Sequence, residues 1–268
     1  MSDPTLSNID AGHYSVVASG RSAHQHWEVW DTERFGRLYR LDGAFMASER
    51  DAHIGHEALV HVPAIAHGNV RRALVLGGGD GGSARELLRH DAVRVTVVDI
   101  DADVIALSRK YLQAIHDGAL DDRRVDIRMG DAHWFVMTAN DRFDLVVFDL
   151  TDPYRSPSLH DSAFFAACKR LLAPDGALSV QLGSPTYQRQ QVRRLLDDLR
   201  SCFRTVTPFV TDIPLYGGAW AFACASDAVA PGAIDQATLV ARIGVLSGLR
   251  EISPTRYRQS IERGDFLR

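Results

Sequence analysis

The apolar and polar positions of residues 69 to about 225 follow two alternating patterns. Continuous apolar runs predict strands at Arg72–Leu76, Val93–Val98, Val125–Met129, Phe143–Phe148, Ala177–Leu182 and Ala219–Ala225. Helical spacing predicts helices at Ser83–Arg89, Ala102–Ile115 with a continuation to Gly118, a short stretch after Asp131, Ser162–Leu172 and Gln188–Cys202. Because strands that are apolar throughout are typical of parallel sheets covered on both faces, this part predicts a doubly wound α/β domain.

The first 68 residues have a different pattern. Short strand-like segments, separated by Gly and Asp turns, occur at Ser15–Ser19, His26–Asp31, Arg37–Leu41 and Ala44–Met46. Their aromatic residues, expected to form the core of this unit, are Trp27, Trp30, Phe35 and Tyr39. With a helix from about Asp51 to His67, the pattern predicts a small antiparallel β-domain over residues 1–68. The α/β domain then spans residues 69–268, and its tail after Pro231 is expected to form one or two helices.

Composition narrows the class of protein. The formal net charge is −4 and no Lys/Arg run argues for nucleic acid. No apolar stretch approaches the roughly 18 residues of a membrane span, and the first residues do not form a secretory signal. Cys168, Cys202 and Cys224 are too few and too widely spaced for a disulfide framework or a zinc site, so we expect reduced, buried thiols and a cytoplasmic protein.

The segment Gly77–Gly82 follows a predicted strand and precedes a predicted helix. Such a glycine-rich turn seats a nucleotide or nucleoside against exposed backbone, and the glycine spacing also fits a dinucleotide fingerprint. Asp80 inside the turn would repel a pyrophosphate, since two like charges at about 4 Å and an effective dielectric near 20 cost about 4 kcal/mol. The turn therefore predicts a nucleoside whose tail is cationic, or at least not anionic.

Four more aspartates follow strand ends at the edge where open α/β sheets bind ligands. Asp99 can accept both hydroxyls of a ribose; the alternatives are a solvent-facing residue or a helix cap. Asp131 can accept the exocyclic amine of adenine, or act as N-cap of the helix beginning at Ala132, and the two roles are compatible. Asp149 ends an apolar strand and is a candidate functional carboxylate, whereas Asp152 has a turn as its alternative.

A cluster of possible metal ligands, His53, His56, Glu57 and His61, lies in the predicted linking helix. It does not have the His-Glu-x-x-His pattern, and no fourth ligand group suggests itself. We therefore predict no metal site.

Taken in order along the chain, the motifs resemble those of the polyamine aminopropyltransferases, the spermidine synthase family. The similarity runs from about Ser22 to Asp227. The motifs that carry it are Asp42-Gly43, Glu49-Arg50-Asp51, His61-Val62-Pro63, Gly77–Gly82, Asp99-Ile100-Asp101, Ser108-Arg109-Lys110-Tyr111-Leu112, Gly130-Asp131, Asp149-x-x-Asp152-Pro153 and Pro214-Leu215-Tyr216-Gly217-Gly218.

The resemblance implies a class I methyltransferase-like (Rossmann-like) fold behind a small N-terminal β-domain, usually in a homodimer or homotetramer. It implies transfer of the aminopropyl group of decarboxylated S-adenosylmethionine, a co-substrate rather than a cofactor, to an amine such as putrescine, with release of methylthioadenosine. The residues that would hold the adenosyl part are Gln25, Gly77, Gly79, Asp99, Asp131 and Ala132. Those that would bind the amine side are His56, Asp80, Asp152 and Tyr216, with Asp149 as proton acceptor.

The chemistry of these residues agrees with that reaction. An alkylamine with a pKa near 10 is protonated at neutral pH, and freeing its lone pair costs about 4 kcal/mol. Asp149 can accept the proton as the new bond forms, while Asp80 and Asp152 stabilise the remaining ammonium groups. A donor that keeps the methionine carboxylate would meet Asp80, so the sequence favours a decarboxylated donor.

Some positions depart from the family pattern. Met46 and Gly55 stand where the family usually has a glutamine and a tyrosine, and Arg155 places a cation where a polyamine would pass. The identity of the acceptor amine is therefore left open. Two alternative functions also remain: a methyltransferase that uses S-adenosylmethionine, disfavoured by Asp80, and a non-catalytic relative that binds only the nucleoside.

Overall fold

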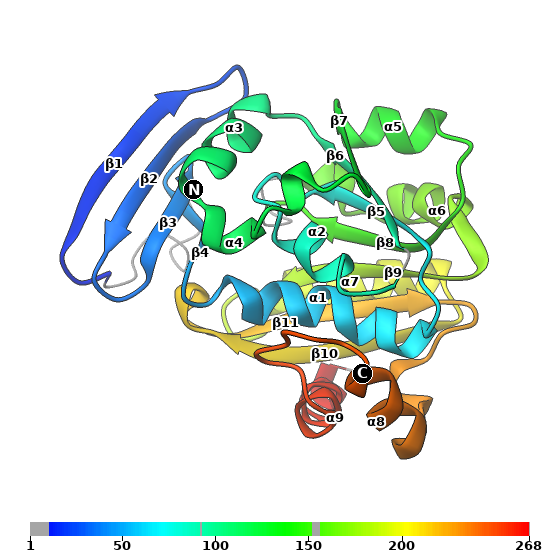
Figure 1. Cartoon of the computed structure of the whole chain (residues 1–268). Helices are drawn as coiled ribbons and strands as arrows, with labels where there is room; N and C mark the ends of the chain where they lie inside the picture. Colours follow the sequence, from blue (N-terminus) through cyan, green and yellow to red (C-terminus); the bar gives the residue numbers. More distant parts are fainter. Residues whose placement is uncertain (1–10, 92, 152–155, 268) are drawn as a thin grey trace.

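The computed structural model describes residues 11–91, 93–151 and 156–267, which contain a small and a large β-sheet (Figure 1). The strands of the large sheet are β5 (Arg72–Gly77), β6 (Arg94–Asp99), β7 (Val125–Met129), β8 (Phe143–Asp149), β9 (Leu172–Gly183), β10 (Thr205–Ile213) and β11 (Gly218–Ser226). Within the described ranges their order is β10-β11-β9-β8-β5-β6-β7. Strands β5 to β9 run parallel, whereas β10 and β11 are antiparallel to their neighbours. The predicted Rossmann-like fold is confirmed.

Helices cover both faces of the large sheet. They are α1 (Ala52–His67), α2 (Gly82–Leu87), α3 (Ala102–Tyr111), α4 (Gln113–His116), α5 (Ala132–Thr138), α6 (Ser162–Arg170), α7 (Arg189–Cys202), α8 (Gln236–Gly244) and α9 (Pro254–Glu262). Alternate residues of β5 point to opposite faces of the sheet. Ala73 and Val75 belong to one apolar core, together with residues of α1, α2 and α8. Leu74 and Leu76 belong to the core on the other face, together with residues of α5, α6 and α7. This two-sided burial explains the continuous apolar runs.

The sequence predictions of three segments are wrong. Strand β10 was not predicted, because Pro208 and three threonines interrupt its apolar pattern; the structure places this strand at the sheet edge, where proline is tolerated. The helix predicted to continue to Gly118 is interrupted at Leu112, whose φ of −118° is not helical. Strand β9 begins at Leu172 rather than Ala177, and Leu172 pairs with Phe143.

The N-terminal sheet is antiparallel, with strands β1 (Tyr14–Arg21), β2 (His26–Thr32), β3 (Gly36–Leu41) and β4 (Ala44–Ser48) in that order. In Figure 1 it stands beside the large sheet, next to α3. Its side chains Val29 and Leu41 form one apolar cluster with Val104 and Leu107 of α3. This contact fixes the small sheet over the carboxyl edge of the large one. The boundary between the two predicted domains stays a prediction.

Cys168 and Cys224 are buried and Cys202 is partly exposed; all three are free thiols. The expected burial thus holds for two of the three. Across the described ranges, no helix combines the length and apolar character needed to cross a membrane.

Candidate active site

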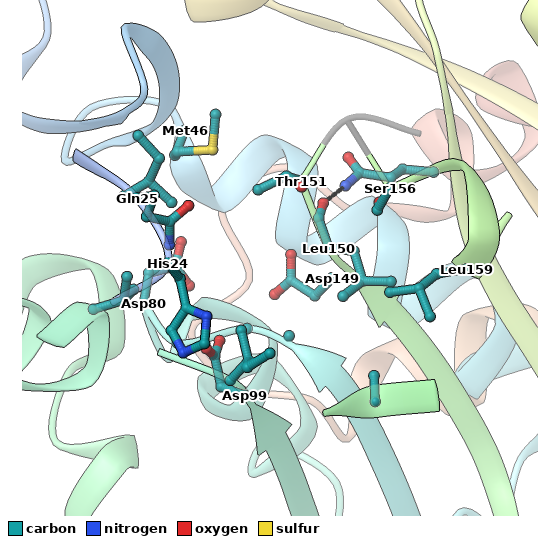
Figure 2. A pocket seen from close by; sticks show the side chains of 18 of the residues that line it. His24, Gln25, Met46, Asp80, Asp99, Asp149, Leu150, Thr151, Ser156 and Leu159 are labelled. Carbon is teal, nitrogen blue, oxygen red and sulfur yellow. Dashed lines mark hydrogen bonds between the residues drawn. The ribbon is translucent and has the colours of Figure 1, made fainter. Parts of the chain in front are cut away.

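A cavity of about 240 Å³ opens at the carboxyl ends of β5 and β8, the neighbouring strands from which the chain order runs in opposite directions. Figure 2 shows Asp80, Asp99 and Asp149 around one space, with His24 and Gln25 across from Leu150 and Leu159. Every predicted site residue that the structure describes lines this cavity: Gln25, His56, Gly77, Gly79, Asp80, Asp99, Asp131, Ala132, Asp149 and Tyr216. Asp152 and Arg155 lie outside the described residues.

Two carboxylates meet one imidazole at the inner end of the cavity. His56 Nε2 lies 3.5 Å from Asp80 Oδ2 and 3.7 Å from Asp149 Oδ2. The side chains of His56 and Asp80 are 9% and 6% exposed, and that of Asp149 is 16% exposed. Little water screens the two carboxylates, so the His56/Asp80/Asp149 cluster is suited to hold a cation.

Burial is the main influence on Asp149. Desolvation raises the pKa of its carboxyl from the ordinary 3.8 to about 6; His56 opposes the rise and Asp80 adds to it. A carboxylate whose pKa is raised toward neutrality is a stronger proton acceptor than a surface aspartate. Asp149 therefore combines position and basicity suited to proton transfer.

The glycine-rich turn brings α1 close to the acidic cluster. A Cβ on Gly82 would lie 2.2 Å from His56 Cε1, so only glycine lets the imidazole rest against this turn. The N–H of Gly78 donates to the carbonyl oxygen of Asp149 over 2.8 Å, which ties the turn to the end of β8. The turn thus sets the mutual position of His56 and Asp149.

Asp80 is held in place by two donors. The N–H of Gly82 donates to Oδ1 over 2.8 Å, and the Tyr39 hydroxyl donates to Oδ2 over 3.4 Å. Tyr39 belongs to β3, so the small sheet supplies part of the wall around the acidic cluster. Burial and the neighbouring Asp80 raise the pKa of Tyr39, which keeps this hydroxyl a donor.

Asp99 closes β6 at the other side of the cavity. Its Oδ1 accepts the N–H of Asp101 over 2.8 Å, and burial raises the pKa of its carboxyl. A Cβ on Gly79 would lie 2.7 Å from Asp99 Oδ2, so the turn approaches this carboxylate closely. The N-cap of α3 is Asp101, so the helix-cap alternative for Asp99 is wrong.

Asp131 is an N-cap in this structure. Its carboxylate accepts the N–H of Trp134 over 2.8 Å at the start of α5, while the residue also lines the cavity beside Ala132. The cap alternative is confirmed. The adenine role, which is compatible with it, stays a prediction.

Gln25 reaches the cavity from the turn between β1 and β2. Its Nε2 donates to Asp101 Oδ2 over 2.8 Å, and the Ser22 hydroxyl donates to the same oxygen over 2.7 Å. The start of α3 therefore anchors this turn above Asp99.

The His/Glu cluster of the linking helix does not converge on one point. Glu57 accepts N–H groups of Arg250, Glu251 and Ile252, each over 2.8 Å, in the C-terminal tail. His61 contacts Glu86 of α2 at 3.0 Å, one turn along that helix from Gly82, against which His56 rests. Of this cluster, only His56 joins a group of ligand-type atoms within 4.8 Å of one another, with Asp80 and Asp149; a second such group among the described residues is His67, Asp144 and Asp175, away from the cavity.

Several cavity residues were not predicted as site residues. They include His24, Tyr39, Leu41, Phe45, Gln181 and Trp220, and Met46 lines the cavity too. The Gln181 amide donates to the carbonyl oxygen of Leu150, and the Tyr216 hydroxyl donates to that of Met46. The sequence predicts Tyr39 for the core of the small sheet, and strand alternation alone gives no signal of its hydrogen bond to Asp80.

Known proteins resemble this chain over most of its length. The spermine/spermidine synthase domain profile matches residues 52–231. A polyamine aminopropyltransferase of Nitrosomonas europaea is 42% identical over 240 residues, covering 87% of this chain and 74% of that protein. Polyamine aminopropyltransferase 1 of Pseudomonas aeruginosa is 39% identical over 209 residues, covering 77% of this chain and 73% of that protein.

Solved structures agree with the sequence comparisons. A spermidine synthase in complex with the transition-state analogue AdoDATO superposes with a TM-score of 0.88 at 29% identity, covering 94% of this chain and 86% of that one. The spermidine synthase of Thermotoga maritima gives a TM-score of 0.85 at 27% identity, with the same coverage. This chain therefore belongs to the spermine/spermidine synthase family.

Proposed function

We propose that this protein is a polyamine aminopropyltransferase that moves the aminopropyl group of decarboxylated S-adenosylmethionine to an aliphatic amine and releases methylthioadenosine. One observation carries the proposal: a single cavity joins the His56/Asp80/Asp149 cluster to the strand-end carboxylate Asp99 and to Asp131. The family to which the chain belongs supports the same activity.

The donor would bind with its nucleoside on the side of Gln25 and Asp99. The Asp99 carboxylate would accept hydrogen bonds from the ribose hydroxyls, and that of Asp131 would accept one from the exocyclic amine of adenine. Gly77 and Gly79 line the cavity, and their backbone would lie under the ribose and sulfonium. This orientation directs the aminopropyl tail toward Asp80.

Asp149 would accept the proton of the attacking amine. The nitrogen lone pair forms a bond to the carbon next to the sulfonium, the carbon–sulfur bond breaks, and its electron pair leaves with the sulfur as a thioether. The proton passes from nitrogen to the Asp149 carboxylate, whose raised pKa suits it for this step. His56 and Tyr216 line the amine side, and Asp152 is proposed to anchor a second ammonium group.

Asp80 would select the donor. A carboxylate on the donor tail would enter a buried site already occupied by two acidic side chains, 3.5 and 3.7 Å from the same imidazole nitrogen. At separations of about 4 Å, repulsion between like charges of about 4 kcal/mol disfavours S-adenosylmethionine itself.

The direct test is to incubate the purified protein with decarboxylated S-adenosylmethionine and a panel of amines, and to measure methylthioadenosine by chromatography. We expect release that depends on the amine, and none when S-adenosylmethionine replaces the decarboxylated donor. Absence of methylthioadenosine with every amine would support a non-catalytic relative. Methyl transfer from S-adenosylmethionine would establish a methyltransferase instead.

The proposal includes a homodimer or homotetramer acting in the cytoplasm on small-molecule substrates, without nucleic acid or membrane partners. Strand β1 at the sheet edge supports self-association, since Tyr14, Val16 and Val17 are 56%, 52% and 40% exposed. Light scattering of the purified protein tests this part, and a monomer at micromolar concentration would contradict it.

A further inference from the structure

A second, smaller cavity of about 30 Å³, the side cavity, adjoins the active site. Four residues line both cavities: His56, Asp149, Gln181 and Tyr216. The other walls of the side cavity come mainly from α1, β4 and β10. The side cavity therefore begins beside the proposed proton acceptor.

Two residues that line the side cavity each carry a buried polar atom without a hydrogen-bond partner among the described residues. These atoms are His56 Nδ1 and Asp149 Oδ2. The other ring nitrogen, His56 Nε2, faces the carboxylates of Asp80 and Asp149. Because buried polar atoms are nearly always paired with protein or with an ordered water, each of the two atoms should have a partner.

The other polar side chains at the side cavity are already paired. Both oxygens of Asp51 accept hydrogen bonds, one from the Ser48 hydroxyl and the other from the N–H of Leu215. The Gln181 amide and the Tyr216 hydroxyl donate to backbone carbonyls. None of these groups is directed at the two unpaired atoms.

The size and the chemistry of the side cavity both fit one water molecule. A buried site holds a water when about 10–15 Å³ of space is open to it, so a volume of about 30 Å³ admits one. A water needs at least two polar partners, and it can donate to a carboxylate oxygen while it donates to or accepts from an imidazole nitrogen. One water would therefore pair both atoms, whichever tautomer His56 adopts.

We propose that the side cavity is a binding site for one water, hydrogen-bonded to His56 Nδ1 and Asp149 Oδ2, and that this water positions the proton acceptor. The positioning role rests on the proposed aminopropyl transfer, whereas the occupancy of the site does not. By donating to the Asp149 carboxylate, the water favours its charged form, which is the form that accepts a proton from the amine. The water thus acts on the amine through Asp149.

High-resolution diffraction from crystals of the purified protein tests the occupancy. We expect electron density for one water in the side cavity, at about 2.7–3.2 Å from both atoms. A side cavity without such density, in crystals whose other buried waters are ordered, would overturn the proposal. This experiment does not depend on turnover, so it decides the site even if the proposed function fails.

Ala47→Val tests the positioning role. Ala47 is buried and lines the side cavity but not the main one, so two added methyl groups should displace the water, which a crystal structure of the variant checks. The midpoint of kcat/KM against pH should then rise by about one pH unit or more, as expected when a charged carboxylate loses a hydrogen bond. A midpoint that does not move after loss of the water would overturn the role.

Ala44→Val is the matched control. Ala44 lies in the same strand, β4, is also buried and lines neither cavity, so its valine adds the same volume without reaching the water. The pH midpoint of this variant should stay that of the unaltered protein. An equal rise in both valine variants would overturn the role, because it would trace the shift to packing in β4.

Ser83→Ala separates the water from a direct protein partner. Ser83 Oγ is buried, has no hydrogen-bond partner of its own among the described residues, and lies close enough to Asp149 to oppose the rise in its pKa that burial causes. A midpoint that rises in Ser83→Ala and stays unchanged in Ala47→Val would assign the role to the serine hydroxyl and overturn that of the water. No turnover with any amine would overturn the proposed function and, with it, the positioning role, but not the water site.

Discussion

Replacing Asp149 by asparagine should make the protein more stable and inactive. Burial raises the pKa of this carboxyl from 3.8 to about 6, so the folded state binds the proton more tightly than the unfolded state. The cost of the buried charge is absent below about pH 4, grows as the pH rises, and is complete above about pH 6. The difference between the two pKa values corresponds to a destabilisation of the folded state by about 3 kcal/mol, and the uncharged asparagine would not cause it.

Urea unfolding at several pH values measures this effect. The stability gain of Asp149→Asn should approach about 3 kcal/mol at pH 7.5 and disappear near pH 4. Aminopropyl transfer by the same variant should fall by about 100-fold to 10,000-fold, as expected when a proton acceptor is removed. In the unaltered protein, kcat/KM should decline as the pH falls through about 6, because Asp149 becomes protonated.

Asp126→Asn is a suitable control, because Asp126 is 61% exposed and its surface ion pair with Arg128 is worth about 1 kcal/mol or less. Its stability should follow that of the unaltered protein at every pH. Equal or lower stability of Asp149→Asn at pH 7.5 would refute the claim that folding holds this carboxylate in an unfavourable environment. Retained turnover would refute its role in proton transfer.

Three further predictions concern the supports of the site. Gly82→Ala places a Cβ 2.2 Å from His56 Cε1, so kcat/KM should fall about 100-fold, with Gly244→Ala unaffected in the same assay. Asp131→Ala removes the helix cap, so it should lose about 1 kcal/mol of stability and also raise the KM for the donor. Asp131→Ser keeps a capping side chain, so only the KM for the donor should rise. An unchanged KM in both variants would exclude contact between Asp131 and the donor. Glu57→Ala leaves three backbone N–H groups of the C-terminal tail without their acceptor, so urea unfolding should show a loss of about 3 kcal/mol or more; a loss no larger than that of Glu57→Gln would contradict it.

The parallel sheet was predictable because its local pattern is strong. Strands buried on both faces must be apolar throughout, and each predicted parallel strand is found, with its ends shifted by at most five residues. Asp99 and Asp149 could be placed at one edge because parallel strands end on the same side of a sheet. Strand β10, whose Pro208 interrupts the pattern, shows where this reasoning stops.

The role of the N-terminal sheet was less predictable. Tyr39 is buried in the apolar cluster of the small sheet, as its aromatic pattern predicts, but it also donates to Asp80, and Trp27 is only partly buried. Which face of a small sheet meets another domain depends on packing between segments far apart in the sequence. No local periodicity encodes that choice.

The sequence by itself determined the order of the parallel strands and of the helices between them, the glycine-rich turn and the carboxylates at the strand ends, because each depends on neighbours a few residues away. Only the tertiary structure decided that His56 rests on Gly82 between Asp80 and Asp149. The raised pKa of Asp149 is also decided by the tertiary structure, because residues from distant parts of the chain together exclude water from this carboxyl.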